Sequence, residues 1–319
     1  MNTTTTTNLF AAAALLLAAP PGAAGAECVI PSKPGGAMDI TCKLARKALP
    51  DTALKLTYLP GGIGAVAWHT LVSQRRAEPD TLVAFSGGSL LNLAEGKFGK
   101  AQARDVRWVA ALGIDYGMIA VRADAPWRTL DDLMEAIRRD PQGVLIGVSG
   151  TIGSQDWMKV ALLAQRAGIE PRRLRFVALE GGGETFTAMQ ANYVQVISGD
   201  TSEATQYAGP GKVRVLAVLA ERRLPGVLAA VPTAREQGYD VVWPVIRGLW
   251  MGPGVPDTDY RRWVRAFDRM QTTPGFAEQR AAAGLYPFSL TGDALARWVE
   301  QAIDDYRRQA RELNLVRRH

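Results

Sequence analysis

The sequence predicts an α/β protein built around mostly parallel sheets. Short β-like runs alternate with helical patterns along the chain, and Gly-rich or Ser/Thr-rich turns join them. The chain has 319 residues, which is enough for two domains at the usual ~100 to 200 residues each. Its hydrophobic fraction of 47% is ordinary for a globular protein, so the composition gives no indication of disorder.

The first half of the chain repeats a plan of strand, turn and helix. Strands are expected at 28–30, 54–59 and 81–85, and helices at 38–49 and 65–74. In the first helix, Ile40, Leu44 and Ala48 share one face, and Asp39 lies in the first turn. The turns that follow the strands are rich in glycine and lie at 31–36, 60–64 and 86–89.

The second half begins near Pro126 and follows the same plan. Thr129 and Asp132 form a capping pair for one helix, and Ser154 is a candidate N-cap for another. Strands are expected at 144–148, 174–178, 194–197 and 213–219. The chain returns to the first unit at 249–251, and amphipathic helices at 257–271 and 292–313 are expected to pack there.

Each Gly-rich turn from a strand to a helix is a candidate anion site. Glycine lets the backbone approach a ligand closely, and the turn aims free N–H groups and the positive end of the helix dipole at it. Several such turns at the carboxyl ends of strands would define a cleft between two α/β units. For any single turn, glycine could equally well serve only to make a tight connection between a strand and a helix. It is the recurrence of these turns that favours a ligand-binding cleft.

The cysteines and histidines of the sequence indicate a disulfide and give no pattern typical of a metal site. The two cysteines, Cys28 and Cys42, lie close in sequence, and in an exported protein an even count favours a disulfide over two unpaired buried thiols. Closing a loop of about 15 residues contributes on the order of 3 kcal/mol. The only histidines are His69 and His319, and no Cys/His spacing is typical of zinc, so we expect no metal site.

The formal net charge of +6 can favour anionic partners. Lysine and arginine are nevertheless scattered along the chain, as in the pairs Arg75–Arg76 and Arg222–Arg223. Nucleic-acid binding would need a basic patch within a recognisable module, and the sequence has neither, so we expect no nucleic-acid partner.

The N-terminus predicts a signal peptide at residues 1–26 and a periplasmic location. Leu9–Ala19 is apolar but shorter than the ~20 residues that span a bilayer. Residues 24–26 (Ala-Gly-Ala) offer a cleavage site after Ala26, which leaves Glu27 as the first residue of the mature chain. The segment before the apolar core carries no Lys or Arg, and a retained apolar tail is the alternative.

Six short segments together resemble one known family. They are Ser32–Asp39 (Ser-Lys-Pro-Gly-Gly-Ala-Met-Asp), Pro60–Gly64, Gly150–Ser154, Gly181–Glu184, Val231–Gly238 and Gly248–Trp250. Their order and spacing cover the mature chain and resemble the substrate-binding proteins of tripartite tricarboxylate transporters, also called the TctC or Bug family. The Cys28 and Cys42 pair around Lys33–Gly36 further resembles the tricarboxylate-binding branch.

The resemblance implies a type II periplasmic-binding-protein fold, in which two α/β domains joined by two crossover segments close on a ligand in the cleft between them. Domain 1 would comprise residues 27–120 and 247–319, and domain 2 residues 121–246. The implied protein is a monomeric, non-catalytic, cofactor-free receptor for a small carboxylate, namely a tricarboxylate such as citrate. It would serve the integral membrane subunits of the transporter. A dicarboxylate or aromatic-carboxylate ligand, or a sensory role beside a membrane receptor, is the alternative.

The resemblance also implies the residues that bind the ligand. Backbone N–H groups and water would hold one carboxylate at Gly35, Gly36, Ala37, Met38 and Asp39, and at Gly61, Gly62, Ile63 and Gly64. The remaining contacts would come from Ser86, Ser89, Thr151, Ser154, Gln155, Gly183, Glu184 and Asp200. A trivalent anion in a closed cleft also needs a cation, and Lys33 and Arg247 lie beside the expected cleft segments. Two departures from the family, Ala37-Met38 and Gly62-Ile63, predict a different pocket shape.

Two enzymatic interpretations compete for the same residues. Gly62–Ala67 matches the dinucleotide fingerprint G-x-G-x-x-A, with Asp80 as the acid ~20 residues on. Asp80 precedes the next predicted strand, however, whereas a ribose-binding acid should end it. A serine hydrolase needs a Ser elbow, a His and an acid, but no G-x-S-x-G exists and His69 falls inside a helix beside Trp68. We therefore expect no enzyme.

Overall fold

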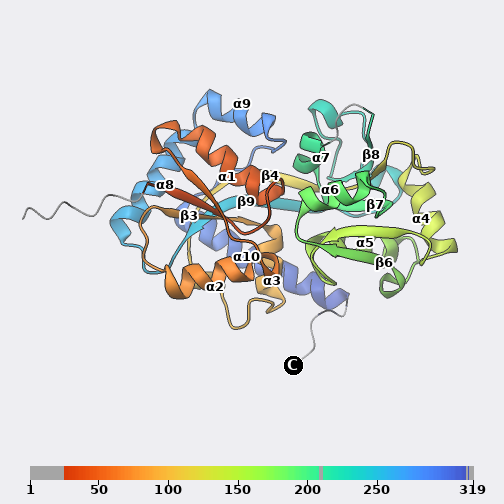
Figure 1. Ribbon diagram of the computed structural model, residues 1–319, viewed down its shortest axis with the longest axis horizontal. Helices are drawn as coiled ribbons and strands as arrows, with labels where there is room; N and C mark the ends of the chain where they lie inside the picture. Colours follow the sequence, from red (N-terminus) through yellow and green to blue (C-terminus); the bar gives the residue numbers. More distant parts are fainter. Residues whose placement is uncertain (1–24, 208–210, 314, 316–319) are drawn as a thin grey trace, which may run out of the picture.

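The computed structural model describes residues 25–207, 211–313 and 315. Two β-sheets share one long strand, and helices cover both faces of each sheet (Figure 1). We call the part built on the first sheet the first lobe and the part built on the other the second lobe. The predicted α/β class is confirmed, while the residue bounds of the two domains stay a prediction.

The first sheet has the strand order β2-β1-β3-β9-β4. Its strands are β1 (Glu27–Ile30), β2 (Lys55–Tyr58), β3 (Thr81–Ser86), β9 (Pro244–Met251) and the first part of β4 (Arg107–Arg122). Strands β1, β2 and β3 pair in parallel, whereas β9 runs antiparallel to both of its neighbours. The first sheet is therefore mixed and not mostly parallel, because β9 returns from the second lobe against the direction of β3.

Strand β4 is the element that passes from one sheet to the other. Residues 107–116 pair with β9 in the first sheet, and residues 117–122 pair with β7 and β8 in the second. Sequence reasoning missed this strand, which is buried along most of its length and so lacks an alternating pattern. Asp115 and Gly117 lie at the passage between the sheets.

The second sheet has a parallel core with antiparallel neighbours. It contains β5 (Leu145–Ser149), β6 (Arg175–Leu179), β7 (Val196–Asp200) and β8 (Val213–Leu219). Strand β5 pairs in parallel with β6 and β7, and β4 runs antiparallel to β7 and β8. Strand β7 begins and ends later than the strand predicted at 194–197, and Gly199 and Asp200 are its last residues.

Helices of the first lobe are α1 (Ala37–Ala48), α2 (Ala65–His69), α3 (Gly87–Ala94), α8 (Asp257–Gln271), α9 (Pro274–Ala282) and α10 (Gly292–Glu312). Helices of the second lobe are α4 (Leu130–Arg139), α5 (Gln155–Arg166), α6 (Gly182–Gln190) and α7 (Thr201–Tyr207). The predicted caps at Thr129, with its partner Asp132, and at Ser154 are confirmed by hydrogen bonds to backbone N–H groups. Helix α10 runs beneath both lobes (Figure 1), and Leu313 beyond its end joins the core of the second lobe.

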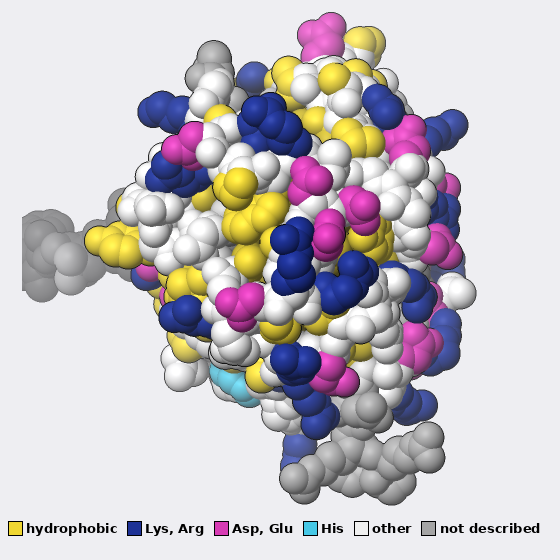
Figure 2. Space-filling model, turned by 90° about the vertical axis from the view of Figure 1, so that its right-hand side faces the viewer, with side chains coloured by type: hydrophobic (Ala, Val, Ile, Leu, Met, Phe, Trp, Pro, Cys, Tyr) yellow, Lys and Arg dark blue, Asp and Glu magenta, His cyan; other side chains and the backbone are white. Residues whose placement is uncertain are grey.

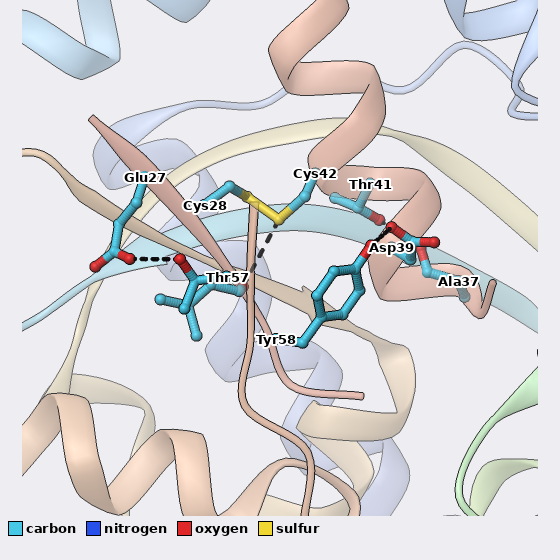
Figure 3. Close-up of a disulfide and its surroundings, with 9 residues drawn as sticks. Glu27, Cys28, Ala37, Asp39, Thr41, Cys42, Thr57 and Tyr58 are labelled. Carbon is cyan, nitrogen blue, oxygen red and sulfur yellow. Dashed lines mark hydrogen bonds between the residues drawn. A yellow bond between two sulfur atoms is a disulfide. The ribbon is translucent and has the colours of Figure 1, made fainter. Parts of the chain in front are cut away.

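The predicted disulfide between Cys28 and Cys42 is confirmed. It joins β1 to α1, with 5.7 Å between the two Cα atoms (Figure 3). The bond fixes the helix that follows the first Gly-rich turn against the strand that precedes it. The disulfide therefore fixes the position of α1, and with it the N-terminus of this helix, relative to β1.

The surface carries charges of both signs. On the face of the second lobe shown in Figure 2, Lys and Arg side chains are interspersed with Asp and Glu side chains. None of the helices in the described part of the chain combines the length and apolarity needed to cross a bilayer. The predicted signal peptide lies almost entirely outside the described residues.

Candidate functional site

A cavity of about 70 Å³ lies between the two lobes. The N-cap residues of four helices line it: Gly36 for α1, Ser86 for α3, Ser154 for α5 and Gly181 for α6. The other lining residues are Pro31, Ser32, Ala37, Met38, Ile63, Gly88, Asn92, Ser149, Gln155, Asp156, Glu180, Gly182, Asp200, Glu203 and Arg247. Helix N-termini from both lobes therefore converge on one cavity.

The two Gly-rich loops at residues 34–37 and 181–183 touch each other across the cleft. The Tyr207 hydroxyl donates a hydrogen bond to the carbonyl of Gly35 at 2.9 Å. A Cβ atom added at Gly183 would lie 2.9 Å from the carbonyl oxygen of Pro34. This backbone-to-backbone approach requires glycine, and it means that the cleft is closed.

Asp39 is a supporting residue of the first loop. Its carboxylate accepts hydrogen bonds from the Gly35 N–H at 2.7 Å, the Tyr58 hydroxyl at 2.9 Å and the Lys43 ammonium at 2.7 Å. Figure 3 shows Asp39 and Tyr58 pointing toward each other beside the disulfide. The side chain is fully buried and does not line the cavity, so it shapes the turn that presents Gly36 and Ala37.

The Gly-rich loop at residues 60–64 places Ile63 at the wall of the cavity. Ile63 has a φ of +50°, which is unusual for a β-branched residue, and its carbonyl accepts a hydrogen bond from the Asn92 side chain at 3.2 Å. Gly62 lines an adjoining outer pocket of about 400 Å³ together with Lys33, Thr151 and Glu184. This outer pocket is the mouth of the cleft.

Gln155 reaches across the cleft from the second lobe to the first. It is the first residue of α5, and its amide packs against Gly88 at the start of α3. Its Nε2 donates to the Asp200 carboxylate at 3.0 Å, while its buried Oε1 has no hydrogen-bond partner among the described residues. Ser89 is turned away from the cavity, because its hydroxyl caps α3 by accepting from the Ser86 N–H.

The floor of the cavity is a buried network of charges. Arg247 from β9 donates through Nη2 to Asp115 at 2.7 Å and to Asp200 at 2.5 Å. Lys159 from α5 binds Asp200 at 2.5 Å and Asp156 at 2.8 Å. All five side chains are at most 3% exposed. Breaking such a network by removing one partner is costly, since it leaves a buried charge unpaired.

Glu203 from α7 completes the floor and connects it to the first lobe. Its Oε1 accepts from the Ala37 N–H, the first amide of α1, at 3.1 Å, and its Oε2 accepts from the Asp200 N–H at 3.2 Å. The carboxyl group packs against Gly182, where a Cβ atom would overlap it. The position at the N-terminus of α1 that suits an anion is thus taken by a side chain of the second lobe.

The network shifts the pKa values of its members in opposite directions. Burial, reinforced by the neighbouring Asp200 and Asp156, raises the pKa of Glu203 to about 8. Burial also raises the pKa of Asp156. For Asp200, burial acts upward but the cations of Lys159 and Arg247 outweigh it and lower the pKa. Asp200 is therefore the firmly ionised member, and Glu203 takes up a proton near neutral pH.

The structure brings together some of the predicted site residues and separates others. Gly36, Ala37, Met38, Ile63, Ser86, Ser154, Gln155, Asp200 and Arg247 line the inner cavity. Lys33, Gly62, Thr151 and Glu184 lie at the mouth, where Lys33 pairs with Glu184 across the cleft at 3.3 Å. Gly35, Asp39, Gly61, Gly64, Ser89 and Gly183 line neither space.

Sequence reasoning missed Asp115, Asp156, Lys159 and Glu203 as members of the site. Glu203 had a signal, because Asp200 and Glu203 have the spacing of a capping pair at the start of a helix. Lys159 had none, since a lysine in an amphipathic helix is expected on the solvated face. Among the described residues, no three His, Cys, Asp or Glu side chains are grouped so that they could hold a metal ion.

Two α/β lobes that close over a polar cleft define the class of periplasmic binding proteins, and the predicted fold class is confirmed. A model of the family described as "Tripartite tricarboxylate transporter family receptor" matches residues 82–315. The chain belongs to this family of periplasmic solute-binding receptors, as its motifs indicated.

Relatives agree with this assignment. A UPF0065 protein of Bordetella pertussis is 22% identical over 285 residues, which cover 86% of this chain and 85% of the relative. MatC of Rhodopseudomonas palustris, solved with bound malate, has a TM-score of 0.76 at 20% identity, covering 89% and 98% of the two chains. An R. palustris protein solved with adipate has a TM-score of 0.80 at 19% identity, covering 91% and 97%. At these identities the structural likeness shows the fold alone.

Proposed function

We propose that this protein is a non-catalytic receptor that captures a small carboxylate in the periplasm and delivers it to the membrane subunits of a tripartite tricarboxylate transporter. The observation that carries the proposal is the convergence of four helix N-termini on the closed cavity. Their N–H groups and dipoles favour a carboxylate. Export would follow from the signal peptide that the sequence predicts at residues 1–26.

The size and charge of the cavity favour a small ligand. A volume of about 70 Å³ is well below the ~300 to 1,000 Å³ of pockets for drug-sized ligands. The four buried carboxyl groups of the floor would also repel a trianion, and burying unpaired charge is costly. The tricarboxylate stays a prediction of the sequence, and these two features support the dicarboxylate alternative. Malate and adipate bound to two structural neighbours are consistent with that alternative.

A thermal-shift screen of the mature protein tests the proposal. The panel contains citrate, isocitrate, aconitate, malate, succinate, glutamate and aromatic carboxylates, with succinamide as a neutral control. A ligand at 100 times its Kd stabilises the folded state by ~2.7 kcal/mol, which should raise Tm by roughly 5 to 10 °C. Stabilisation by carboxylates and none by succinamide is the expected result. If no carboxylate shifts Tm, the receptor proposal fails.

A further inference from the structure

The cavity floor holds more buried acids than buried bases. Four carboxyl groups belong to it, those of Asp115, Asp156, Asp200 and Glu203, and each is at most 3% exposed. In the described part of the chain, two cations, Lys159 and Arg247, are buried with them. When every group is ionised, the network has a net charge of −2, so the cleft would gain from a ligand that brings positive charge.

The buried cations are already engaged with the acids. The Lys159 ammonium donates to Asp156, to Asp200 and to the carbonyl of Gly199, which accounts for all three of its N–H groups. One nitrogen of Arg247 serves both Asp115 and Asp200. Neither cation donates to Glu203, whose hydrogen bonds among the described residues come from the backbone N–H groups of Ala37 and Asp200.

Among the described residues, two side chains that line the cavity have unpaired polar atoms: one has a free hydrogen-bond acceptor and the other has free donors. The Gln155 Oε1 is a buried acceptor without a donor. The Arg247 Nε and Nη1 are buried donors that find no acceptor in the part of the chain that the structure describes, and the side chain is 1% exposed. A ligand that satisfies both kinds offers a hydrogen-bond donor to Gln155 and an acceptor, such as a carboxylate oxygen, to Arg247, because buried polar groups are ordinarily paired.

We propose that the cleft selects carboxylates that also carry an ammonium group, with Glu203 and Gln155 receiving the ammonium and Arg247 helping to receive the carboxylate. This inference rests on the proposed receptor function and names its ligand class as amino carboxylates. The Gln155 amide donates to the Asp200 carboxylate and the Glu203 carboxyl group accepts from the Asp200 backbone N–H, so both side chains adjoin Asp200 in the lining of the cavity. An ammonium group has three donors and no acceptor, which suits such a set of oxygens.

A metal cation would neutralise the same charge less well. The described residues contain no group of three metal-ligating side chains, and each carboxylate of the floor already has polar partners within the protein. The raised pKa of Glu203 also agrees with a cavity that is short of positive charge.

Isothermal titration with matched ligand pairs tests the inference on the unmodified mature protein. Aspartate is compared with succinate, glutamate with glutarate, and alanine with propionate, so that each pair differs by the ammonium group. We expect the ammonium ligand of at least one pair to bind at least about tenfold more tightly, which corresponds to roughly 1.4 kcal/mol. Ethylammonium, which lacks the carboxylate, should bind more weakly than either member of that pair.

The substitution Glu203→Gln then assigns the contact. It should remove most of the difference in affinity between the ammonium ligand and its partner, whatever its effect on the affinity of the pair as a whole. Glu278→Gln, on the exposed surface of α9, is the matched control and should change neither affinity.

The outcomes separate the two proposals. If ligands without the ammonium bind as tightly as their partners, the amino-carboxylate inference is overturned and the receptor function stands. If no member of any pair binds, the amino-carboxylate inference is overturned, and the receptor proposal falls as well if no other carboxylate of the thermal-shift panel binds. If ethylammonium binds as tightly as the amino carboxylates, the carboxylate is not recognised and both are overturned. The comparison on the wild-type protein decides the matter even if the Glu203 variant does not fold.

Discussion

Replacing Glu203 by glutamine should change how stability depends on pH. The pKa of Glu203 is about 8 in the folded chain, against an ordinary value of 4.5. Between these values the folded state holds a proton that the unfolded state has lost, so stability falls as pH rises. Each pH unit in this window costs about 1.4 kcal/mol. From pH 5 to pH 7.5 the wild type should therefore lose ~3 kcal/mol that the glutamine variant does not lose.

Glutamine itself has a smaller and constant cost. Its amide keeps one acceptor for the Ala37 N–H, but its NH₂ cannot accept from the Asp200 N–H as the Glu203 Oε2 does. A lost hydrogen bond costs ~1 kcal/mol. The variant should thus be less stable than, or equal to, the wild type at pH 5 and more stable at pH 7.5.

Urea unfolding of the mature wild type and the variant at pH 5, 6, 7 and 7.5 measures both effects. Glu278→Gln, an exposed carboxylate on α9, controls for the general loss of one charge and should follow the wild type. Parallel stability curves for the wild type and the Glu203 variant across this range would show that Glu203 is ionised in the folded chain, and the reasoning about its surroundings would be wrong.

Three further changes should act on the disulfide and on closure of the cleft. Replacing Cys28 and Cys42 by serine removes a closed loop of about 15 residues and should lower the free energy of unfolding by ~3 kcal/mol; an unchanged urea midpoint would contradict this. Gly182→Ala places a Cβ where the Glu203 carboxyl packs and should weaken binding of any ligand found in the screen by tenfold or more, whereas Gly275→Ala, where a Cβ meets open space, should not. Tyr207→Phe removes one hydrogen bond across the cleft, worth ~1 kcal/mol, and should weaken that ligand about fivefold; equal affinity in titration would show that the bond does not contribute to closure.

The elements that sequence reasoning found are those with local signals. The helix at 257–271 and the strand at 213–219 match the structure, because each has a clear periodic pattern between turns. The caps at Thr129 and Ser154 depend on short-range hydrogen bonds, and these too were predictable. Strand β4 was missed, since burial on both faces removes the alternation that identifies a strand.

The candidate site likewise has parts that the sequence could predict and parts that depend on the fold. The Gly-rich turns were visible because positive φ and close backbone approach demand glycine, as at Gly35. Arg247 was named only for its position beside an expected cleft segment, and its burial between Asp115 and Asp200 depends on pairing between strands far apart in sequence. No local pattern encodes that arrangement, so the acidic floor could be found only from the fold.

Glu203 connects closure of the cleft to its chemistry. In the closed cleft its carboxyl group accepts the first N–H of α1, which is where a ligand carboxylate would otherwise bind. Burial beside Asp200 and Asp156 makes this arrangement favourable only when a positive charge accompanies it, and a proton supplies that charge near neutral pH. An ammonium group of a ligand would supply the same charge in place of the proton. The group that links the two lobes through the Ala37 N–H would then also be the group that distinguishes one carboxylate from another.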